Sequence, residues 1–278
     1  MRKRIVTIGG GTGQPELLRG LREYDVDLTA IVTTIDNGGS SGRLREKYGI
    51  LPPGDIRRCL AALSARPELV SEWEHRFSDG PNAGHTVGNL VLLEAFQKYG
   101  DVHEALQHIQ ERYQIRGNVL PVTLEQTNLI ARLEDGSIVR GETNIDIPKH
   151  DPSLRIESVW LDPAATTTPQ VRQAIADADM VVLSMGDLFT SLIPNLLVAG
   201  VTQAIAQSKA RVVYICNRST KPGETDHFTP QDFYATVERY LAPAKLDEMI
   251  VDDIANDNNP ALVSGPKAAA VIMKLCNS

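Results

Sequence analysis

Hydrophobic runs and helical spacings alternate along the first part of the chain. The β-branched run at residues 5–8 ends in a series of glycines, a pattern typical of a buried strand. Leu17, Leu18 and Leu21 then share one face of a short helix. The apolar run at 28–34 predicts a second strand. Strand, helix and strand within about 30 residues form a βαβ unit, which requires a parallel sheet.

The middle of the chain predicts helices first and short strands afterwards. The helices are predicted over 55–64, 67–77, 87–99 and 102–113, so that a helical insert spans about 55–115. The short strands are predicted over 119–123, 128–133 and 137–141. Because Asp135-Gly136 is a hairpin-turn signal, we interpret about 118–145 as a β-hairpin region, an antiparallel excursion from the main sheet.

Alternation of strands and helices resumes after the hairpin region. Strands are predicted over 156–161, 180–184, 212–216 and 249–251. Helices are predicted over 169–178, 192–207, 231–241 and 268–275, with a loop at 256–260. No linker or internal repeat divides the chain. The pattern therefore predicts a single α/β domain over 1–278, with a Rossmann-like, doubly wound, mostly parallel sheet, a helical insert and a short antiparallel excursion.

Composition narrows the class of protein without naming a function. Hydrophobic residues make up 42% of the 278 residues and charged residues 23%, which excludes a disordered or fibrous chain. The net charge of −7 argues against nonspecific binding to nucleic acid or membrane. The three cysteines show no metal-binding or disulfide spacing, and the apolar run after the basic start is too short for a signal or membrane segment. A cytoplasmic location is expected.

The first glycine-rich turn is the first candidate ligand site. Gly10, Gly11, Thr12 and Gly13 follow the first strand, where backbone N–H groups can approach a phosphate at a helix N-terminus. Gln14 stands where a dinucleotide fingerprint needs its third glycine, which disfavours an NAD-dependent dehydrogenase. No Walker lysine follows either. The alternative is a tight turn that binds nothing.

Further candidates follow the second strand and open the predicted helices. Asp36 suits a ribose hydroxyl or Mg²⁺, and the expected loop 37–42 offers N–H and hydroxyl groups before Arg43. Asp55 is either a helix N-cap or a ligand contact, and Arg57 and Arg58 oppose the helix dipole, which favours an anion nearby. His85 is a structural or a ligand residue. The remaining candidate ligand contacts are Asn37, Gly39, Ser40, Ser41, Asn89, Gly186, Asp187, Thr190, Asn195 and Asn217.

Familiar catalytic motifs are absent from the sequence. There is no G-x-S-x-G nucleophile turn, and no carboxylate pair stands in an apolar setting of the glycosidase kind. The histidines show no metal-ligand spacing. The residues alone therefore indicate a binder of nucleotides or sugar phosphates and leave open whether it catalyses a reaction.

Seven ordered motifs identify a family resemblance. They are Ile-Gly-Gly-Gly-Thr-Gly at 8–13, Gly-Gly-Ser-Ser-Gly-Arg-Leu at 38–44, Pro-Pro-Gly-Asp-Ile-Arg at 52–57, Gly-His-x-x-Gly-Asn-Leu at 84–90, Gly-Glu-Thr-Asn-Ile at 141–145, Leu-x-Thr-Ser-x-x-Pro-Asn-Leu-Leu-Val at 188–198 and Lys-Pro-Gly-Glu-Thr-Asp at 221–226. In this order they resemble the bacterial gluconeogenesis factor family, the YvcK group of CofD-like proteins.

The resemblance implies a Rossmann-like cytoplasmic protein needed for growth on gluconeogenic carbon sources and for cell shape. Members of this family bind UDP-sugars, notably UDP-N-acetylglucosamine, without an established catalytic activity. The leading hypothesis is therefore a regulatory protein that binds UDP-N-acetylglucosamine or another nucleoside diphosphate ligand. A homo-oligomer formed through the helical middle third is a further expectation.

The wider superfamily supplies the alternative. It contains the Mg²⁺-dependent 2-phospho-L-lactate transferase, so the alternative is a similar transferase acting on a nucleoside diphosphate-linked donor. Asp36 is then the candidate catalytic residue, and Asp36 and Asp55 are the candidate Mg²⁺ ligands. Asn37 stands where the family often has a second aspartate, which weakens this alternative. Residues 184–187 read Ser-Met-Gly-Asp where Gly-Pro-Gly-Ser is usual, which leaves the specificity of that loop open.

Overall fold

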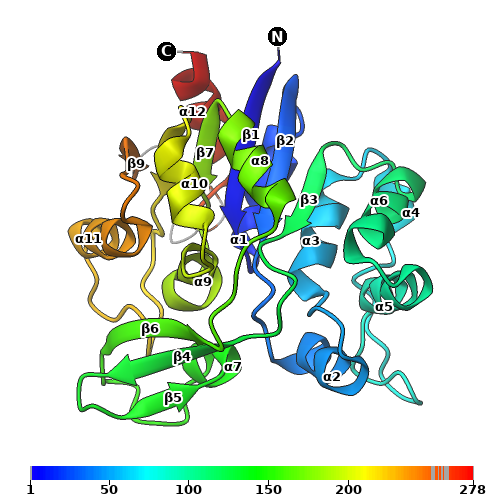
Figure 1. The fold of residues 1–278 in the computed structure, drawn as a ribbon, viewed down its shortest axis with the longest axis horizontal. Coiled ribbons are helices and arrows are strands. Elements are labelled where there is room, and N and C mark those ends of the chain that lie inside the picture. Colours follow the sequence, from blue (N-terminus) through cyan, green and yellow to red (C-terminus); the bar gives the residue numbers. More distant parts are fainter. Residues whose placement is uncertain (1, 252–253, 256, 258, 260–262, 278) are drawn as a thin grey trace.

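The computed structural model describes residues 2–251, 254–255, 257, 259 and 263–277 and places a six-stranded parallel sheet at its centre (Figure 1). The strand order is β3-β2-β1-β7-β8-β9. The strands are β1 (Lys3–Gly9), β2 (Val26–Val32), β3 (Asn118–Pro121), β7 (Met180–Leu183), β8 (Arg211–Ile215) and β9 (Glu248–Ile250). Every pairing between neighbours is parallel. The predicted α/β, Rossmann-like, doubly wound fold is confirmed.

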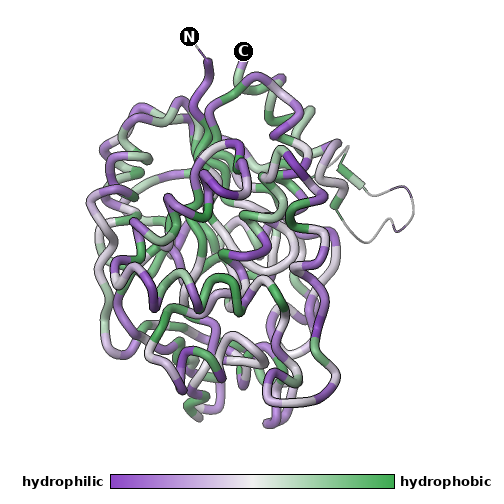
Figure 2. The backbone as a smooth tube through the Cα atoms, turned by 90° about the vertical axis from the view of Figure 1, so that its right-hand side faces the viewer, coloured by the Kyte–Doolittle hydropathy of each residue, from purple (hydrophilic) through white to green (hydrophobic). Residues whose placement is uncertain are grey.

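Helices cover both faces of this sheet. One hydrophobic cluster contains side chains from α1 (Gly13–Leu21), α3 (Gly54–Leu63), α4 (Pro67–Val70), α5 (Val87–Tyr99), α6 (Val102–Arg112) and α12 (Gly265–Asn277). The other contains side chains from α8 (Pro169–Asp177), α9 (Ile193–Leu196), α10 (Val201–Gln207) and α11 (Pro230–Leu241). Figure 2 shows hydrophobic positions along the interior and hydrophilic ones along the outer turns. No described helix combines the length and the apolar character needed to cross a bilayer.

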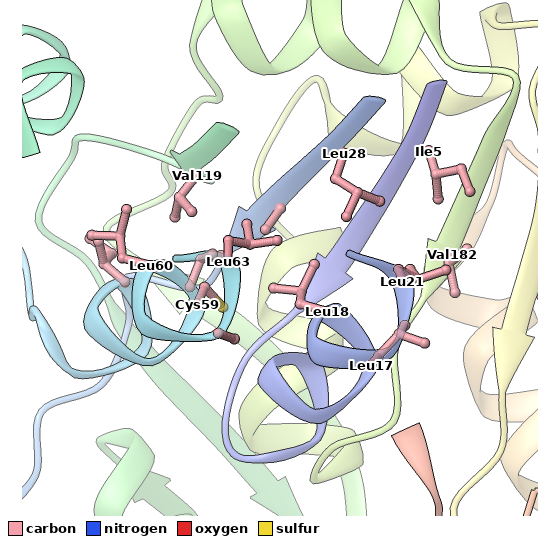
Figure 3. Packing of buried hydrophobic residues seen from close by; sticks show 14 of the residues in the cluster. Ile5, Leu17, Leu18, Leu21, Leu28, Cys59, Leu60, Leu63, Val119 and Val182 are labelled. Atoms are coloured by element: carbon pink, nitrogen blue, oxygen red, sulfur yellow. The ribbon is translucent and has the colours of Figure 1, made fainter. Parts of the chain in front are cut away.

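Alternation along each strand divides its side chains between the two clusters. On β1, Ile5 belongs to the cluster beneath α1 and Ile8 to the opposite one. Val182 and Val181 on β7 divide in the same way. Figure 3 shows Leu17, together with Leu18 and Leu21 of α1, turned towards the strands. Each such fully buried leucine contributes about 1.5–3 kcal/mol relative to an exposed one, so the three-leucine face fixes α1 behind the glycine turn.

A second, antiparallel sheet lies beyond the carboxyl ends of the main strands. It has the order β5-β4-β6 and consists of β4 (Asn128–Leu133), β5 (Ile138–Arg140) and β6 (Ile156–Asp162). Helix α7 (Glu142–Asp146) follows β5. Figure 1 shows this sheet and α7 on one side of the carboxyl edge, with α2 (Gly39–Tyr48) on the other. The carboxyl ends of β1, β2 and β7 therefore point into the space between them.

The sequence assigned two strands to the wrong sheet. The strand expected at 119–123 was placed in the hairpin region, but β3 pairs in parallel with β2 at the edge of the main sheet. The strand at 156–161 was placed in the parallel sheet, but β6 pairs antiparallel with β4. Hydrophobic periodicity identifies a strand and not its partner, because the partner is chosen by long-range packing.

Three helix boundaries also differ from expectation. The helix expected at 67–77 ends at Val70, and the helix expected at 192–207 is divided into α9 and α10 by residues 197–200, where Gly200 has a φ of +95°. A π-helix, η1 (Leu188–Leu192), precedes them. The glycine-serine segment 37–42 was expected to be a loop, but α2 begins at Gly39 because tertiary hydrogen bonds occupy Ser40 and Ser41. The predicted loop at 256–260 falls largely outside the described residues.

Gln14, which stands where a dinucleotide fingerprint has its third glycine, has a structural role in the first turn. Its side chain is fully buried, and its Nε2 donates hydrogen bonds to the Thr7 carbonyl at 3.2 Å, to Thr7 Oγ1 at 3.1 Å and to the Ile31 carbonyl at 3.0 Å. Its Oε1 accepts from the Cys59 thiol at 3.7 Å. The amide therefore joins α1 to β1, β2 and α3 at the base of the glycine turn.

We expect Gln14→Leu to reduce the free energy of unfolding by about 2–4 kcal/mol, because a leucine of similar volume leaves the buried acceptors of Thr7 and Ile31 without this donor. Urea denaturation measures the loss. Gln107→Leu, on the exposed surface of α6, is the matched control and should change stability little. Equal effects of the two substitutions would contradict the role given to Gln14.

Candidate functional site

A cavity of about 330 Å³ opens at the carboxyl edge of the main sheet, between α2, α3, α7 and η1. We call it the carboxyl-edge cavity. It brings together seven of the residues singled out from the sequence, namely Gly11, Thr12, Asp36, Gly39, Asp55, Asp187 and Thr190. It adds residues that were not among the candidate ligand contacts, although several of them stand in the polar clusters and motifs of the sequence, namely Thr33, Gly38, Arg58, Glu142, Thr143, Asp146, Ile147 and Ser191.

A second pocket of about 200 Å³ shares Gly11, Thr12 and Asp187 with this cavity. We call it the adjoining pocket. Its further members among the candidate contacts are Gly13, Gly186 and Asn217, and its other lining residues are Glu16, Met185, Arg218, Ser219 and Val263. Asn217 accepts a hydrogen bond from the Gly186 N–H at 3.3 Å and donates one to its carbonyl at 2.6 Å, so it joins the loops that follow β7 and β8. The two pockets form one polar region over the turn after β1.

Close packing explains the glycines in that turn. A Cβ atom on Gly13 would lie 2.0 Å from the Met185 carbonyl oxygen, and one on Gly10 would lie 2.6 Å from Asp55 Oδ2. Gly11 has a φ of +66°, which L side chains rarely adopt. The turn is therefore pressed between the loop after β7 and the first turn of α3.

Asp55 bonds both to the glycine turn and to a neighbour in its own helix, α3. Its Oδ2 accepts a hydrogen bond from the Gly11 N–H at 3.0 Å, while Oδ1 forms an ion pair with Arg58. The N-cap position of α3 belongs to Pro53, so the N-cap alternative for Asp55 is wrong. The Asp55 carboxylate thus accepts a hydrogen bond from an N–H group that was expected to bind a phosphate.

The carboxyl-edge cavity is strongly acidic. Five carboxyl groups line it, those of Asp36, Asp55, Glu142, Asp146 and Asp187, and Arg58 is the one cation among its described lining residues. Burial raises the pKa of Asp36, against the lowering effect of the Gly38 N–H at 2.7 Å. Burial and the charges of Asp36, Asp146 and Asp55 raise the pKa of Glu142 to about 8. Glu142 therefore carries a proton at neutral pH.

Lys221 supplies a second internal cation beside the cavity. Its Nζ forms ion pairs with Asp146, with Asp187 at 2.7 Å and with Glu224 at 3.4 Å. Oxygens of these three acids lie within 4.8 Å of one another, close enough to hold a metal ion, but the lysine ammonium group pairs with all three. Burial raises the pKa of Glu224 to about 7, while Lys221 and the Thr190 hydroxyl oppose the shift. Lys221 thus links α7, η1 and the loop after β8.

Two residues predicted to contact a ligand are buried away from both pockets. The Arg57 side chain is only 4% exposed and forms an ion pair with Glu74 at 2.5 Å, whereas its neighbour Arg58 lies at the cavity. Asn195 is fully buried, and its Nδ2 donates to the Gly9 carbonyl at 3.1 Å and to the Ser191 carbonyl at 2.9 Å. Asn195 therefore supports the end of β1 from beneath.

The remaining candidates lie on or beside α2 and also line neither pocket. Asn37 accepts a hydrogen bond from the Thr143 N–H at 3.0 Å, and Ser41 accepts one from the Gly54 N–H at 3.1 Å. Gly10 lies beneath the cavity against Asp55. Four others, Ser40, Arg43, His85 and Asn89, form a separate group on another side of the first turn of α2.

The sequence model of the family described as 2-phospho-L-lactate transferase CofD matches residues 5–265. The chain belongs to this family. The predicted resemblance to CofD-like proteins is thereby confirmed.

Individual relatives of the CofD family chain carry a further name. This chain is 41% identical over 276 residues to the gluconeogenesis factor of Halalkalibacterium halodurans, and the match covers 98% of this chain and 84% of the relative. It is 41% identical over 252 residues to the gluconeogenesis factor of Bacillus subtilis, covering 90% and 78%. A Nostoc relative is 43% identical over 251 residues, which is 89% of this chain and 54% of that relative. The chain thus spans about half the length of some relatives.

A solved structure supports the same assignment. The crystal structure of a protein of the UPF0052 family from Bacillus halodurans superposes on the CofD family chain with a TM-score of 0.85 and 38% identity. The match covers 98% of this chain and 90% of that one. The shared fold therefore includes the antiparallel sheet and the helical insert as well as the main sheet.

We expect Lys221→Ala to lower the free energy of unfolding by about 1–3 kcal/mol, because it removes the cation between three neighbouring carboxyl groups. Millimolar Ca²⁺ should restore part of this loss, since the oxygen atoms of the three groups suit a divalent ion. Thermal unfolding with and without Ca²⁺ measures both effects. Lys98→Ala, on the surface of α5, is the control, and a Ca²⁺ response equal to that of Lys98→Ala would contradict the assignment.

We expect Glu142→Gln to flatten the pH dependence of stability. Between its ordinary pKa of 4.5 and its folded value of about 8, the folded protein holds a proton that the unfolded chain has released. Stability of the wild type therefore falls as the pH rises through this window, and a neutral amide removes that contribution. Thermal unfolding at about pH 5.5 and pH 8 tests this, with Asp135→Asn as control. A Glu142→Gln profile parallel to the wild type would show that Glu142 ionises normally.

Proposed function

We propose that this CofD family chain binds a nucleoside diphosphate-linked ligand, of the UDP-N-acetylglucosamine type, across the carboxyl-edge cavity and the adjoining pocket. The ligand would bind together with a divalent cation. One observation carries the proposal: the N–H groups of the glycine turn, suited to a diphosphate, face a cavity with five carboxyl groups and one lining guanidinium. A diphosphate alone would be repelled there, whereas a cation turns the carboxylates into ligands.

Asp36 and Asp55 fit such a cation. Both offer carboxylate oxygens, the donors that Mg²⁺ prefers, and their charges lie close enough that Asp55 raises the pKa of Asp36. Both line the cavity beside Gly11. When bound, Mg²⁺ would supply the positive charge that the diphosphate and the carboxylates share.

The bond between Asp55 and Gly11 couples the two binding events. An anion at the glycine turn needs the Gly11 N–H, which donates to Asp55 Oδ2 when no ligand is bound. A cation that attracts Asp55 weakens this bond and makes the N–H available. Cation and ligand should therefore strengthen each other's binding.

The cellular role that we propose is that of a gluconeogenesis factor, required for growth on gluconeogenic carbon sources and for cell shape. The names of the Halalkalibacterium and Bacillus relatives support the gluconeogenic part of this role, together with coverage of most of both proteins, and the part in cell shape rests on the family resemblance alone. In the adjoining pocket, Asn217 and Ser219 provide amide and hydroxyl groups for the polar edge of a base or a sugar.

The second candidate function is transfer of a group from such a donor to an alcohol. The family model supports it, as does the environment of Asp36 and Glu142. Burial raises the pKa of both carboxyl groups, so that Asp36 is a stronger base than an exposed aspartate while Glu142 keeps its proton. Asp36 would then accept the proton of the acceptor hydroxyl.

Isothermal titration with UDP-N-acetylglucosamine, in Mg²⁺ and in EDTA, tests the proposal. We expect the wild type to bind at least about tenfold more tightly in Mg²⁺, because the cation and the ligand are coupled. Asp36→Asn should lose this gain, and Asp135→Asn, an exposed acid in the hairpin turn, should keep it.

Two results would decide against this reading. Equal affinity in EDTA and Mg²⁺, unchanged in Asp36→Asn, would remove the ligand from the carboxyl-edge cavity. Release of free nucleotide when an acceptor alcohol is added would instead assign the transferase function.

A further inference from the structure

Four basic side chains gather beside α2, outside both pockets: Arg43 and Lys47 on α2, Arg76, and His85 in the loop before α5. We call them the basic cluster. Arg43 Nη2 donates to the Ala83 carbonyl at 3.2 Å, and Arg76 Nη1 donates to the Gly84 carbonyl at 2.5 Å. Both guanidinium groups are therefore fixed to consecutive residues of the same loop, beside His85.

Gly84 is shaped for this arrangement. It has a φ of +77°, and a Cβ atom there would lie 2.5 Å from Arg43 Nη2. Because Gly84 has no side chain, the Arg43 guanidinium group occupies the space that a side chain at position 84 would fill.

The positive charge of the basic cluster is uncompensated. Arg43, Lys47 and Arg76 form no ion pair with a carboxylate in the described part of the chain, whereas the arginines of α3 each do. All three are exposed, and their charges, together with burial, lower the pKa of His85. In a chain of net charge −7, such a concentration of unpaired cations favours an anion.

His85 is held from the inside as a hydrogen-bond donor. Asn89 Nδ2 donates to Ser40 Oγ at 2.9 Å, and the Ser40 hydroxyl lies 2.8 Å from His85 Nδ1. We assign the single hydrogen of the Ser40 hydroxyl to the bond with Nδ1, and this tautomer places the hydrogen of the neutral ring on Nε2. Asn89 is only 3% exposed, so this chain of bonds is rigid. The motif at 84–90 therefore orients an imidazole.

We propose that the basic cluster binds a phosphate group, free or as part of a small phosphate ester, at a site separate from the carboxyl-edge cavity. Two guanidinium groups, an ammonium group and an imidazole N–H supply donors of the kind that phosphate oxygens accept. The cluster covers one side of a single helix and one short loop, which suits a small anion and not an extended polyanion. Its binding needs no divalent cation, so its test is independent of the proposed function.

The experiment is an NMR titration of the histidine side chains with inorganic phosphate in EDTA, with sodium chloride at equal ionic strength as reference. A bound dianion favours the protonated imidazole, so we expect the pKa of His85 to rise by about 0.5 or more. His85→Gln assigns the signal. Arg43→Gln and the milder Lys47→Gln, whose side chain is fully at the surface, should reduce the shift, and Arg112→Gln on α6 should not.

The outcomes are distinguishable. Saturation by phosphate but not by chloride, lost in Arg43→Gln or Lys47→Gln, supports the site, and tighter binding of glycerol phosphate than of phosphate identifies an ester as the occupant. An equal response to chloride and phosphate, or a shift that survives in folded Arg43→Gln and Lys47→Gln, would overturn the proposal. Failure of UDP-N-acetylglucosamine to bind would leave this result unchanged.

Discussion

Several acidic side chains lie close together at the carboxyl edge of the main sheet. The surrounding loops keep their positions only if the repulsion between these carboxylates is offset by positive charge. Arg58 and Lys221 provide the opposing charge: Arg58 pairs with Asp55 within α3, and Lys221 pairs with Asp146 and Asp187 from two other segments. Asp55 connects the glycine turn to the charges of the cavity, since it accepts a hydrogen bond from the Gly11 N–H and forms an ion pair with Arg58. The shape of the glycine turn and the charge of the cavity are therefore set by the same contact.

Much of the site followed from the polar residues at the ends of predicted strands. Gly11, Asp36 and Asp187 come together because parallel strands place their carboxyl ends at one edge, a property that the alternation of strands and helices already implies. Glu142 and Asp146 could not be found in this way. They enter the cavity from α7, after the antiparallel sheet, and only long-range pairing of β6 with β4 fixes where that sheet lies.

Other differences arise from local geometry that sequence patterns do not resolve. Arg57 and Arg58 are adjacent, yet one turns beneath α3 to Glu74 and the other to the cavity, because neighbours on a helix differ in direction by about 100°. Lys221 was visible within the motif at 221–226, but its role depends on Asp146, which is 75 residues away. Asn195 was predicted to be a ligand contact because the sequence does not show that its amide on α9 turns inwards to the Gly9 carbonyl.

The position of β1 has a consequence for how the chain acquires its site. β1 pairs on one side with β2, soon after it in the sequence, and on the other with β7, where Ile5 lies opposite Met180. The wall formed by residues 185–191 is therefore missing until almost two thirds of the chain has left the ribosome. Contacts of such sequence separation form late and slowly. At this stage an emerging chain would expose the glycine turn and the apolar face of β1. A ligand can bind at the turn only after the second half of the protein has been made.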